Sequence, residues 1–235
     1  MRLLHNGILM NQKKIRRLMH KYNLSCLVRK QNPYRQMIRV MKTNSVSDNL
    51  VNREFREHGP RIILLTDITY IRLNDDFIYL SAILDAFTKE VLSYVLSESL
   101  EIDFVLQTIN LLIQKHGSLL GSSAIIHSDQ GTHYISVKFR QPIEDIGLRQ
   151  SISRRGNHWD NAPQERFFGH MKEELKPCIS NWNTVQDVKE TIDDWMDYYN
   201  HERYQWDLAK LSPVEFYNYH TTGIYPLKQI EIMRS

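Results

Sequence analysis

Short runs of apolar and β-branched residues follow one another between residues 61 and 153. Runs of this length and composition predict β-strands. The five predicted strands are RIILLTDITYIR (61–72), FIYLSAILDAF (77–87), EVLSYVLSES (90–99), SSAIIHS (122–128) and LRQSIS (148–153). The first run is apolar on both faces, which is typical of the buried centre of a sheet. Short connections, including the turn signal at Asn74, Asp75 and Asp76, predict that the first three strands form an antiparallel meander.

Other segments repeat apolar residues every three or four positions, which predicts amphipathic helices. Helices are expected over 11–22, 102–116, 135–146 and 184–199, and another carries Glu165 in its first turns and runs to Leu175. Gly117 and Gly147 are expected stops, and Pro142 is expected to kink or split its helix. The order of elements predicts an α/β fold, a mixed five-stranded sheet flanked by helices and preceded by a small basic helical segment.

Charge is distributed unevenly along the chain. Residues 1–60 hold 13 Lys or Arg and 3 Asp or Glu, a net +10, whereas residues 61–235 hold 17 against 24, a net −7. A basic arm joined to an acidic body suits a polyanion partner for the arm. The predicted helix at 11–22 places Lys13, Lys14, Arg16 and Arg17 outside its apolar stripe. It is either part of a helix-turn-helix or a helix that packs by one stripe and is solvated elsewhere.

Residues 28–60 are polar and basic, and we interpret them as a linker with a short helix near 49–58. The expected organisation is therefore a basic, polyanion-binding arm with a partial helix-turn-helix at 1–60, a core that includes the last long helix at 61–220 and a tail at 221–235. The two cysteines form no CxxC motif, and no signal peptide or long apolar span is present, so a reducing, cytoplasmic location without a membrane is expected.

Three carboxylates stand out as candidates for chemistry. Asp67 lies inside the first predicted strand, Asp129 follows the fourth, and Glu165 begins the helix before Leu175. An unpaired charge inside an apolar strand is costly, and a metal ion offsets that cost. Ligand sites in α/β sheets favour strand ends where the strand order switches. An oxygen-only set of this kind suits Mg²⁺ or Mn²⁺, held as two ions for phosphoryl transfer.

Each candidate also has a purely structural interpretation. Asp67 can be a locally bonded strand residue, Asp129 a turn residue, and Glu165 a solvated residue favoured by the helix dipole. Among the rivals, Asp85 closes a strand, Asp160 can cap the following helix, and Asp75 and Asp76 form a turn. Glu173 and Glu174 are expected to face solvent. His127, His133 and His158 have no recognised zinc spacing. The tryptophans are expected in the core or at docking surfaces.

Several motifs together carry a family resemblance. They are TDITYI (66–71), IIHSDQGTHYIS (125–136), SRRGNHWDNAPQERFFGHMKEEL (153–175), YYNHERYQ (198–205) and LSPVEF (211–216). In this combination the chain resembles, over roughly residues 5–218, the second-frame (OrfB-type) transposases of bacterial insertion sequences, which have a retroviral-integrase-like DDE core. The family separates its last two acidic residues by 35 positions, and Asp129 and Glu165 have that interval.

The resemblance implies a ribonuclease-H-like fold and a catalytic triad of Asp67, Asp129 and Glu165. It implies metal-dependent cleavage at the ends of an insertion sequence, followed by strand transfer by the freed 3′-hydroxyl to target DNA. It further implies a homo-oligomer that bridges two ends and works on nucleoid DNA. Lys172, Arg154 and Arg155 are candidate contacts to DNA, and each also has a structural interpretation as a solvated surface residue.

The sequence departs from the family in two places. Members usually have one more helix before HNGILMNQKKIRRLM (5–19), so either a fusion or an association with an upstream-frame DNA-binding protein, or a truncation, is expected. The alternative function is therefore a truncated, catalytically silent DNA-binding remnant that regulates active transposase. Leu64 stands where the family usually has Trp, a change expected to affect packing. A cellular nuclease of the same fold is disfavoured by the C-terminal motifs.

Overall fold

The computed structural model describes residues 5–8, 10–24, 50, 51, 55, 57–121, 123–129, 131, 133–153 and 161–227. The chain divides into two compact units, one formed by Val28–Met196 and one by Met1–Leu27 together with Asp197–Ser235. The predicted boundaries at residues 60 and 220 stay a prediction. The predicted linker and its short helix lie mostly outside the described residues.

The larger unit contains a five-stranded sheet of the predicted type. Its strands are β1 (Ile63–Leu73), β2 (Asp76–Asp85), β3 (Val91–Ser97), β4 (Ile125–Ser128) and β5 (Arg149–Ile152), in the order β3-β2-β1-β4-β5. β1, β2 and β3 pair antiparallel, as the meander predicted, whereas β4 pairs parallel to both β1 and β5. The mixed sheet with flanking helices is therefore confirmed.

The pairing on the two sides of β1 has very different lengths. β2 pairs with β1 from Leu64 to Leu73, whereas β4 pairs with it only from Ile63 to Leu65. Beyond Leu65, β2 is the only strand among the described residues that pairs with β1. β1 and β4 thus separate immediately before Asp67 and Asp129, which is the switch in strand order where α/β sheets place their sites.

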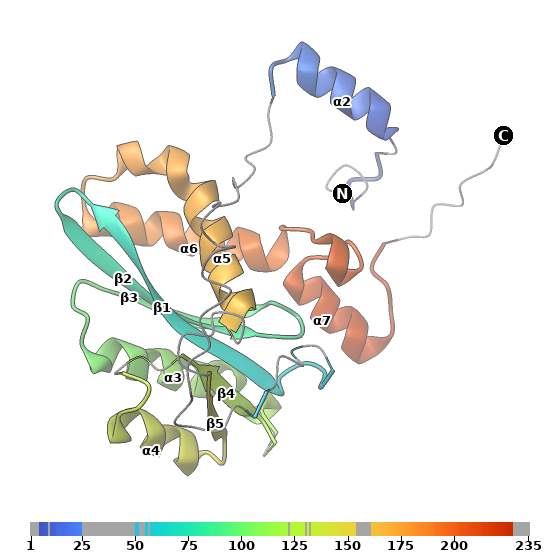
Figure 1. Cartoon of the computed structure of the whole chain (residues 1–235). Coiled ribbons are helices and arrows are strands. Elements are labelled where there is room, and N and C mark those ends of the chain that lie inside the picture. Colours follow the sequence, from blue (N-terminus) through green and yellow to red (C-terminus); the bar gives the residue numbers. More distant parts are fainter. Residues whose placement is uncertain are drawn as a thin grey trace, which may run out of the picture. The chain divides into compact units, whose positions relative to one another are not determined.

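The helices form two groups around the sheet (Figure 1). α3 (Ile102–His116) and α4 (Val137–Asp145) share one apolar core with the sheet, which includes Leu64, Ile126 and Phe139. α5 (Ala162–Leu175) and α6 (Val185–His201) pack on each other, with the rings of Phe167 and Trp195 5.6 Å apart. Short 3-10 turns at Gly117–Leu119 and Lys176–Asn181 follow α3 and α5.

The predicted helices form, with adjustments at their ends. α4 begins at Val137 because the Ser136 hydroxyl accepts a hydrogen bond from the backbone N–H of Phe139. Pro142 lies inside α4 without ending it, and Gly147, with a φ of +77°, follows the helix as predicted. The expectation that Glu174 faces solvent was wrong, because the indole N–H of Trp195 donates to its carboxylate at 3.1 Å.

A buried ion cluster fixes the start of β1. Nη1 and the backbone N–H of Arg61 donate to Oδ2 of Asp85 at 3.0 and 2.9 Å, and Nη2 donates to Glu90 at 2.7 Å. Asp85 also accepts from the backbone N–H of Phe87. These bonds hold Arg61 at a φ of +63°, a conformation that costs a non-glycine residue roughly 1–2 kcal/mol. Asp85 is therefore a structural residue and not a rival for the site.

The smaller unit contains α2 (Gln12–Lys21), a turn at Trp206–Leu208 and α7 (Pro213–Thr222). The predicted helix at 11–22 is confirmed as α2, with the Asn11 side chain as its N-cap. Within this unit the imidazole of His5 stacks on Tyr204, with ring centroids 3.5 Å apart. The sequence analysis missed α7, although Ser212 and Glu215 form a capping box that marks its start.

Candidate active site

Asp67 supplies a carboxylate inside the sheet at the point where β4 ends its pairing. Asp67 retains some exposure as a residue, but protein atoms enclose its carboxyl group. The backbone N–H of Ile68 donates to Oδ1 at 2.8 Å. Burial, followed by the negative charges of Asp129 and Glu165, raises the pKa of Asp67 to about 7, against the opposing effects of the Ile68 N–H and Lys172. The fold therefore brings Asp129 and Glu165 both within electrostatic reach of Asp67.

Asp129 occupies an exposed turn directly after β4. The backbone N–H of Gly131 donates to its Oδ1 at 2.8 Å, which orients the carboxylate over the turn. A Cβ atom on Gly131 would lie 2.9 Å from that oxygen and 3.3 Å from the Tyr134 ring. A contact of 2.9 Å is too close for a carbon, so a side chain at this position would require the Asp129 carboxylate to move.

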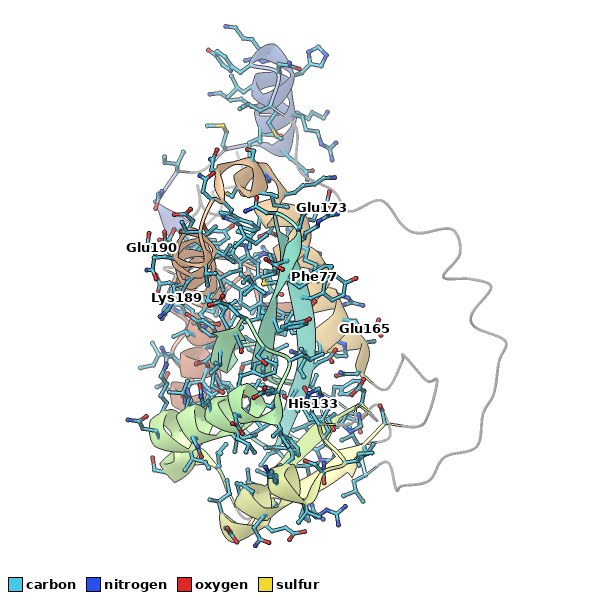
Figure 2. The ribbon with its side chains drawn as sticks, turned by 90° about the vertical axis from the view of Figure 1, so that its left-hand side faces the viewer. Phe77, His133, Glu165, Glu173, Lys189 and Glu190 are labelled. Carbon is cyan, nitrogen blue, oxygen red and sulfur yellow. The ribbon has the colours of Figure 1, made fainter. Side chains whose placement is uncertain are left out.

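Glu165 is carried by the first turn of α5. Pro163 lies near the start of this helix, where its missing N–H costs no hydrogen bond. The side chain of Gln164 donates to the backbone carbonyl of Ala82 at 3.3 Å and so ties the helix to β2. As predicted, Phe168, Met171 and Leu175 form the buried face. Figure 2 shows Glu165 at the end of α5 nearer to His133, with Glu173 toward the other end.

Lys172 lies two turns after Glu165 on the same helix. Its ammonium nitrogen is 4.5 Å from the centroid of the Tyr70 ring, and the charge of Asp67 attracts it. Partial burial lowers the pKa of Lys172, and the attraction of Asp67 opposes that change. α5 therefore places the Glu165 carboxylate and the Lys172 ammonium group on the same side of the helix, near β1, as the seven-residue spacing predicted.

The donor set is appropriate for a hard divalent cation. Three carboxylates offer only oxygen ligands, which Mg²⁺ and Mn²⁺ prefer, and a cation would relieve the repulsion that raises the pKa of Asp67. The side chains are not gathered into a finished coordination shell: within the described ranges, no three His, Cys, Asp or Glu residues are placed closely enough to hold a metal ion. The three carboxylates are suitable ligands for a divalent cation, and binding of the cation would bring their oxygens together.

The remaining predicted residues lie elsewhere. Lys13, Lys14, Arg16 and Arg17 are all exposed on α2, in the smaller unit. Arg154, Arg155, His158 and Asp160 fall outside the described residues. His127 is buried, with its Nδ1 2.9 Å from the Ser151 hydroxyl. Nε2 of His133 is 3.0 Å from the backbone carbonyl of Leu100.

Sequence reasoning missed three residues around the carboxylates, namely Tyr70, Gly131 and Tyr134. The Tyr134 side chain is buried beside Thr66, and the charges of Asp67 and Asp129 raise the pKa of its phenol further than burial alone. The motif DQGTHY predicted a turn, but it did not predict that the ring of Tyr134 would be buried next to Gly131. Tyr70 was predicted only as part of a strand. Its contact with Lys172 could not be predicted because the two residues are about 100 positions apart along the chain.

Comparison with known proteins identifies the family to which this chain belongs. A family model described as an integrase core domain matches residues 57–158, and a second model with that description matches residues 146–213. An uncharacterised transposase-like protein of Haemophilus influenzae is 33% identical over 225 residues, which cover 94% of this chain and 98% of the relative. A transposase for insertion sequence IS904 of Lactococcus lactis is 30% identical, over 94% of this chain and 86% of the relative.

Another relative is the putative transposase InsK of element IS150 of Escherichia coli, 30% identical over 90% of this chain and 73% of the relative. The chain belongs to this family, the transposases of bacterial insertion sequences with an integrase core domain.

Solved structures confirm the fold. The catalytic core domain of HTLV-2 integrase in complex with magnesium matches with a TM-score of 0.54 at 18% identity, over 69% of this chain and 99% of that one. A chain of a simian T-cell lymphotropic virus intasome matches with a TM-score of 0.59 at 16% identity, over 96% of this chain and 73% of that one. The sheet is therefore the ribonuclease-H-like sheet of the integrase cores.

The raised pKa of Asp67 makes stability depend on pH in the absence of metal. The unfolded carboxyl titrates near 3.8 and the folded one near 7, so the folded state binds the proton more tightly. Stability must then fall as pH rises from about 4 to about 7, by at most about 4 kcal/mol. Asp67→Asn removes this loss, so the variant should become progressively more stable than the native chain over that window. Urea denaturation in chelator at pH 4 to 8 measures the difference.

Asp76→Asn, at the exposed start of β2, is the matched control and should follow the native curve at every pH. A constant difference between Asp67→Asn and the native chain from pH 4 to 8 would show that the Asp67 carboxyl is not held at a raised pKa.

A second prediction concerns Gly131. Gly131→Ala should displace the Asp129 carboxylate, because the new methyl group would lie 2.9 Å from its oxygen. We expect DNA cleavage to fall at least tenfold while thermal stability falls by about 1–3 kcal/mol. Gly121→Ala is the control, since its nearest contact is an ordinary 3.7 Å to the Ser123 hydroxyl. Equal cleavage by the two variants would mean that the turn does not need to hold Asp129 in this orientation.

Proposed function

We propose that this transposase cuts DNA at the ends of its insertion sequence and joins the freed 3′-hydroxyl to target DNA, using Asp67, Asp129 and Glu165 as its catalytic carboxylates. The observation that carries the proposal is the enclosed carboxyl of Asp67, whose pKa is raised to about 7 by burial and by the other two members of the predicted triad. Three acids crowded in this way are costly to the fold, and a phosphoryl-transfer site uses that arrangement.

The chain's own groups suggest how the reaction would be supported. Mg²⁺ or Mn²⁺, proposed as two ions, would activate the attacking oxygen and stabilise the leaving oxygen when bound. The Ile68 N–H orients one carboxylate oxygen of Asp67, and the Gly131 N–H orients one of Asp129. Both carboxylates would therefore bind the metal in a fixed orientation. Glu165 would complete the set from α5. Lys172, on the same helix, would contact a neighbouring phosphate as a positive charge.

The alternative of a catalytically silent remnant has less support. A remnant needs none of the three carboxylates, yet the fold keeps all three within interaction distance, at a cost to Asp67. The integrase core models also match 57–213 without a break between them. We therefore favour the enzyme.

We further propose a division of labour along the chain. α2 would contact the DNA backbone through Lys13, Lys14, Arg16 and Arg17, which are all exposed on one short helix. Arg154 and Arg155, just before α5 in sequence, would add contacts near the site. Two element ends must be held together for strand transfer, so a homo-oligomer on nucleoid DNA is the proposed working form. Among the described residues, no helix is long and apolar enough to cross a membrane.

Replacing any one carboxylate tests the catalytic proposal. Asp67→Asn, Asp129→Asn and Glu165→Gln keep the side-chain volume but remove the charge that holds the metal. Each should lower cleavage and strand transfer by at least about a thousandfold, and excess chelator should abolish both for the native chain. The assay uses supercoiled plasmid carrying the insertion sequence, with products mapped to the nucleotide. Asp194→Asn, at an exposed carboxylate of α6, should retain full activity, whereas near-normal strand transfer by a triad variant would remove that residue from the site.

The contribution of α2 is tested by salt dependence. Changing Lys13, Lys14, Arg16 and Arg17 together to Gln should weaken DNA binding and lower the slope of log K against log salt by about one for each phosphate that the helix no longer neutralises. The matched control changes Lys115, Lys138, Arg140 and Arg149, four exposed cations of the larger unit, to Gln. If both fourfold variants reduce the slope equally, the contribution is that of net charge and α2 has no special role.

A further inference from the structure

Two large aromatic side chains lie exposed on the β1–β2 hairpin, close to the candidate site. Tyr70 is 58% exposed and Phe77 is 44% exposed, although both belong to strands. Their rings contact each other edge to face, with centroids 5.3 Å apart and an interplanar angle of 84°. Tyr70 pairs with Tyr79 and Phe77 pairs with Arg72, so the register places both rings on the same face of the hairpin. Phe77 is visible on the hairpin in Figure 2.

Lys172 connects these rings to the carboxylates. Its ammonium group lies 4.5 Å from the centroid of the Tyr70 ring, while the charge of Asp67 attracts it from the other side. A cation over an aromatic face gains about 0.5–1 kcal/mol at an exposed site, so Tyr70 restricts where the ammonium can be. Tyr70 follows Asp67 by three residues of extended strand, about 10 Å, and alternation along β1 directs the two side chains to opposite faces, so Lys172 is the group that interacts with both.

We propose that Tyr70, Phe77 and Lys172, here termed the aromatic ledge, bind an unpaired stretch of the DNA strand next to the phosphate that is cut. Exposed rings beside a fixed cation are the combination with which proteins bind single strands, because bases stack on the rings and the cation meets the backbone. Tyr70 acts as a positioning residue for Lys172, and Phe77 offers its ring to a base. The proposal rests on the proposed function, since it takes the cut strand as the ligand.

The charges around the ledge limit its length. Arg72 lies on the same face with 71% of its side chain exposed, but its guanidinium is 3.7 Å from the Asp75 carboxylate and its Nε donates to the Asn74 carbonyl at 2.9 Å, so it is held at the tip of the hairpin. Beyond it, Asp75 and Asp76 form the exposed tip of the hairpin and would repel a phosphate backbone. The ledge therefore accommodates two or three nucleotides, a length that suits a frayed end and not a long single strand.

Binding to defined oligonucleotides tests the ledge without requiring catalysis. The probes are a blunt 20-base-pair duplex and the same duplex with three unpaired nucleotides at one 3′ end, containing 2-aminopurine. Fluorescence anisotropy of the full chain in chelator gives both affinities, and quenching of 2-aminopurine reports stacking. We expect the native chain to bind the unpaired end at least about fivefold more tightly than the blunt duplex, with quenching.

Three substitutions separate the roles within the ledge. Phe77→Leu keeps an apolar side chain but loses the ring, and should abolish both the preference and the quenching. Tyr70→Leu should weaken the preference, whereas Tyr70→Phe keeps the aromatic face for Lys172 and should retain it. Thermal denaturation of each variant verifies that the hairpin is folded.

Other results would overturn the inference. If Phe77→Leu retains the native preference, the ledge is an apolar contact and not a stacking site. If the native chain shows no preference for the unpaired end, the ledge does not bind a single strand. If sedimentation shows that Phe77→Ser loses a self-association that Phe77→Leu keeps, the ledge contacts a second copy of the chain instead. Asp67→Asn separates this question from catalysis, because it should lose cleavage and keep the preference for unpaired ends.

Discussion

The separation of β1 from β4 is the constraint on which the rest of the molecule depends. The two parallel strands pair at only three positions, and each then continues into a carboxylate, Asp67 within β1 and Asp129 after β4. If the pairing ran further, the backbone of β4 would occupy the space beside Asp67. The early separation opens the sheet at its centre, and α5, which contacts β1, brings Glu165 and Lys172 to that opening.

The same type of residue serves two opposite purposes in this sheet. Asp85 is fully buried, yet it is surrounded by donors from Arg61, Phe87 and Thr88, so its charge is compensated. Asp67 receives one backbone N–H and the attraction of Lys172, but it faces two further acids, so its charge is compensated only in part. The contrast distinguishes a carboxylate that stabilises the fold from one whose charge a bound cation would neutralise. Burial alone would not have distinguished them.

Much of this arrangement could be predicted from the sequence, for physical reasons. Period-two and period-3.6 patterns are local, so the five strands and the helix at 102–116 were predicted within a few residues. The triad depended on a family resemblance, because spacing along a chain does not determine distance in space. The ion cluster around Asp85 was missed because Arg61 is 24 positions away and adopts a backbone conformation that arginine rarely takes. α7 was missed because its apolar periodicity is weak, although its capping residues, Ser212 and Glu215, can be recognised in the sequence.

Beyond Leu65, none of the described residues pairs with β1 on the side away from β2, and this has a consequence for how the chain is made. Beyond Leu65 the strand continues to Leu73 without β4, and such a side exposes backbone donors and acceptors that can pair with another molecule. α5 packs against β1, and its sequence lies almost 100 residues further on. During synthesis the apolar strand therefore exists before its cover does. A polypeptide that stopped short of α5 would present this strand for intermolecular pairing, so premature termination would yield aggregates and not an inactive soluble core.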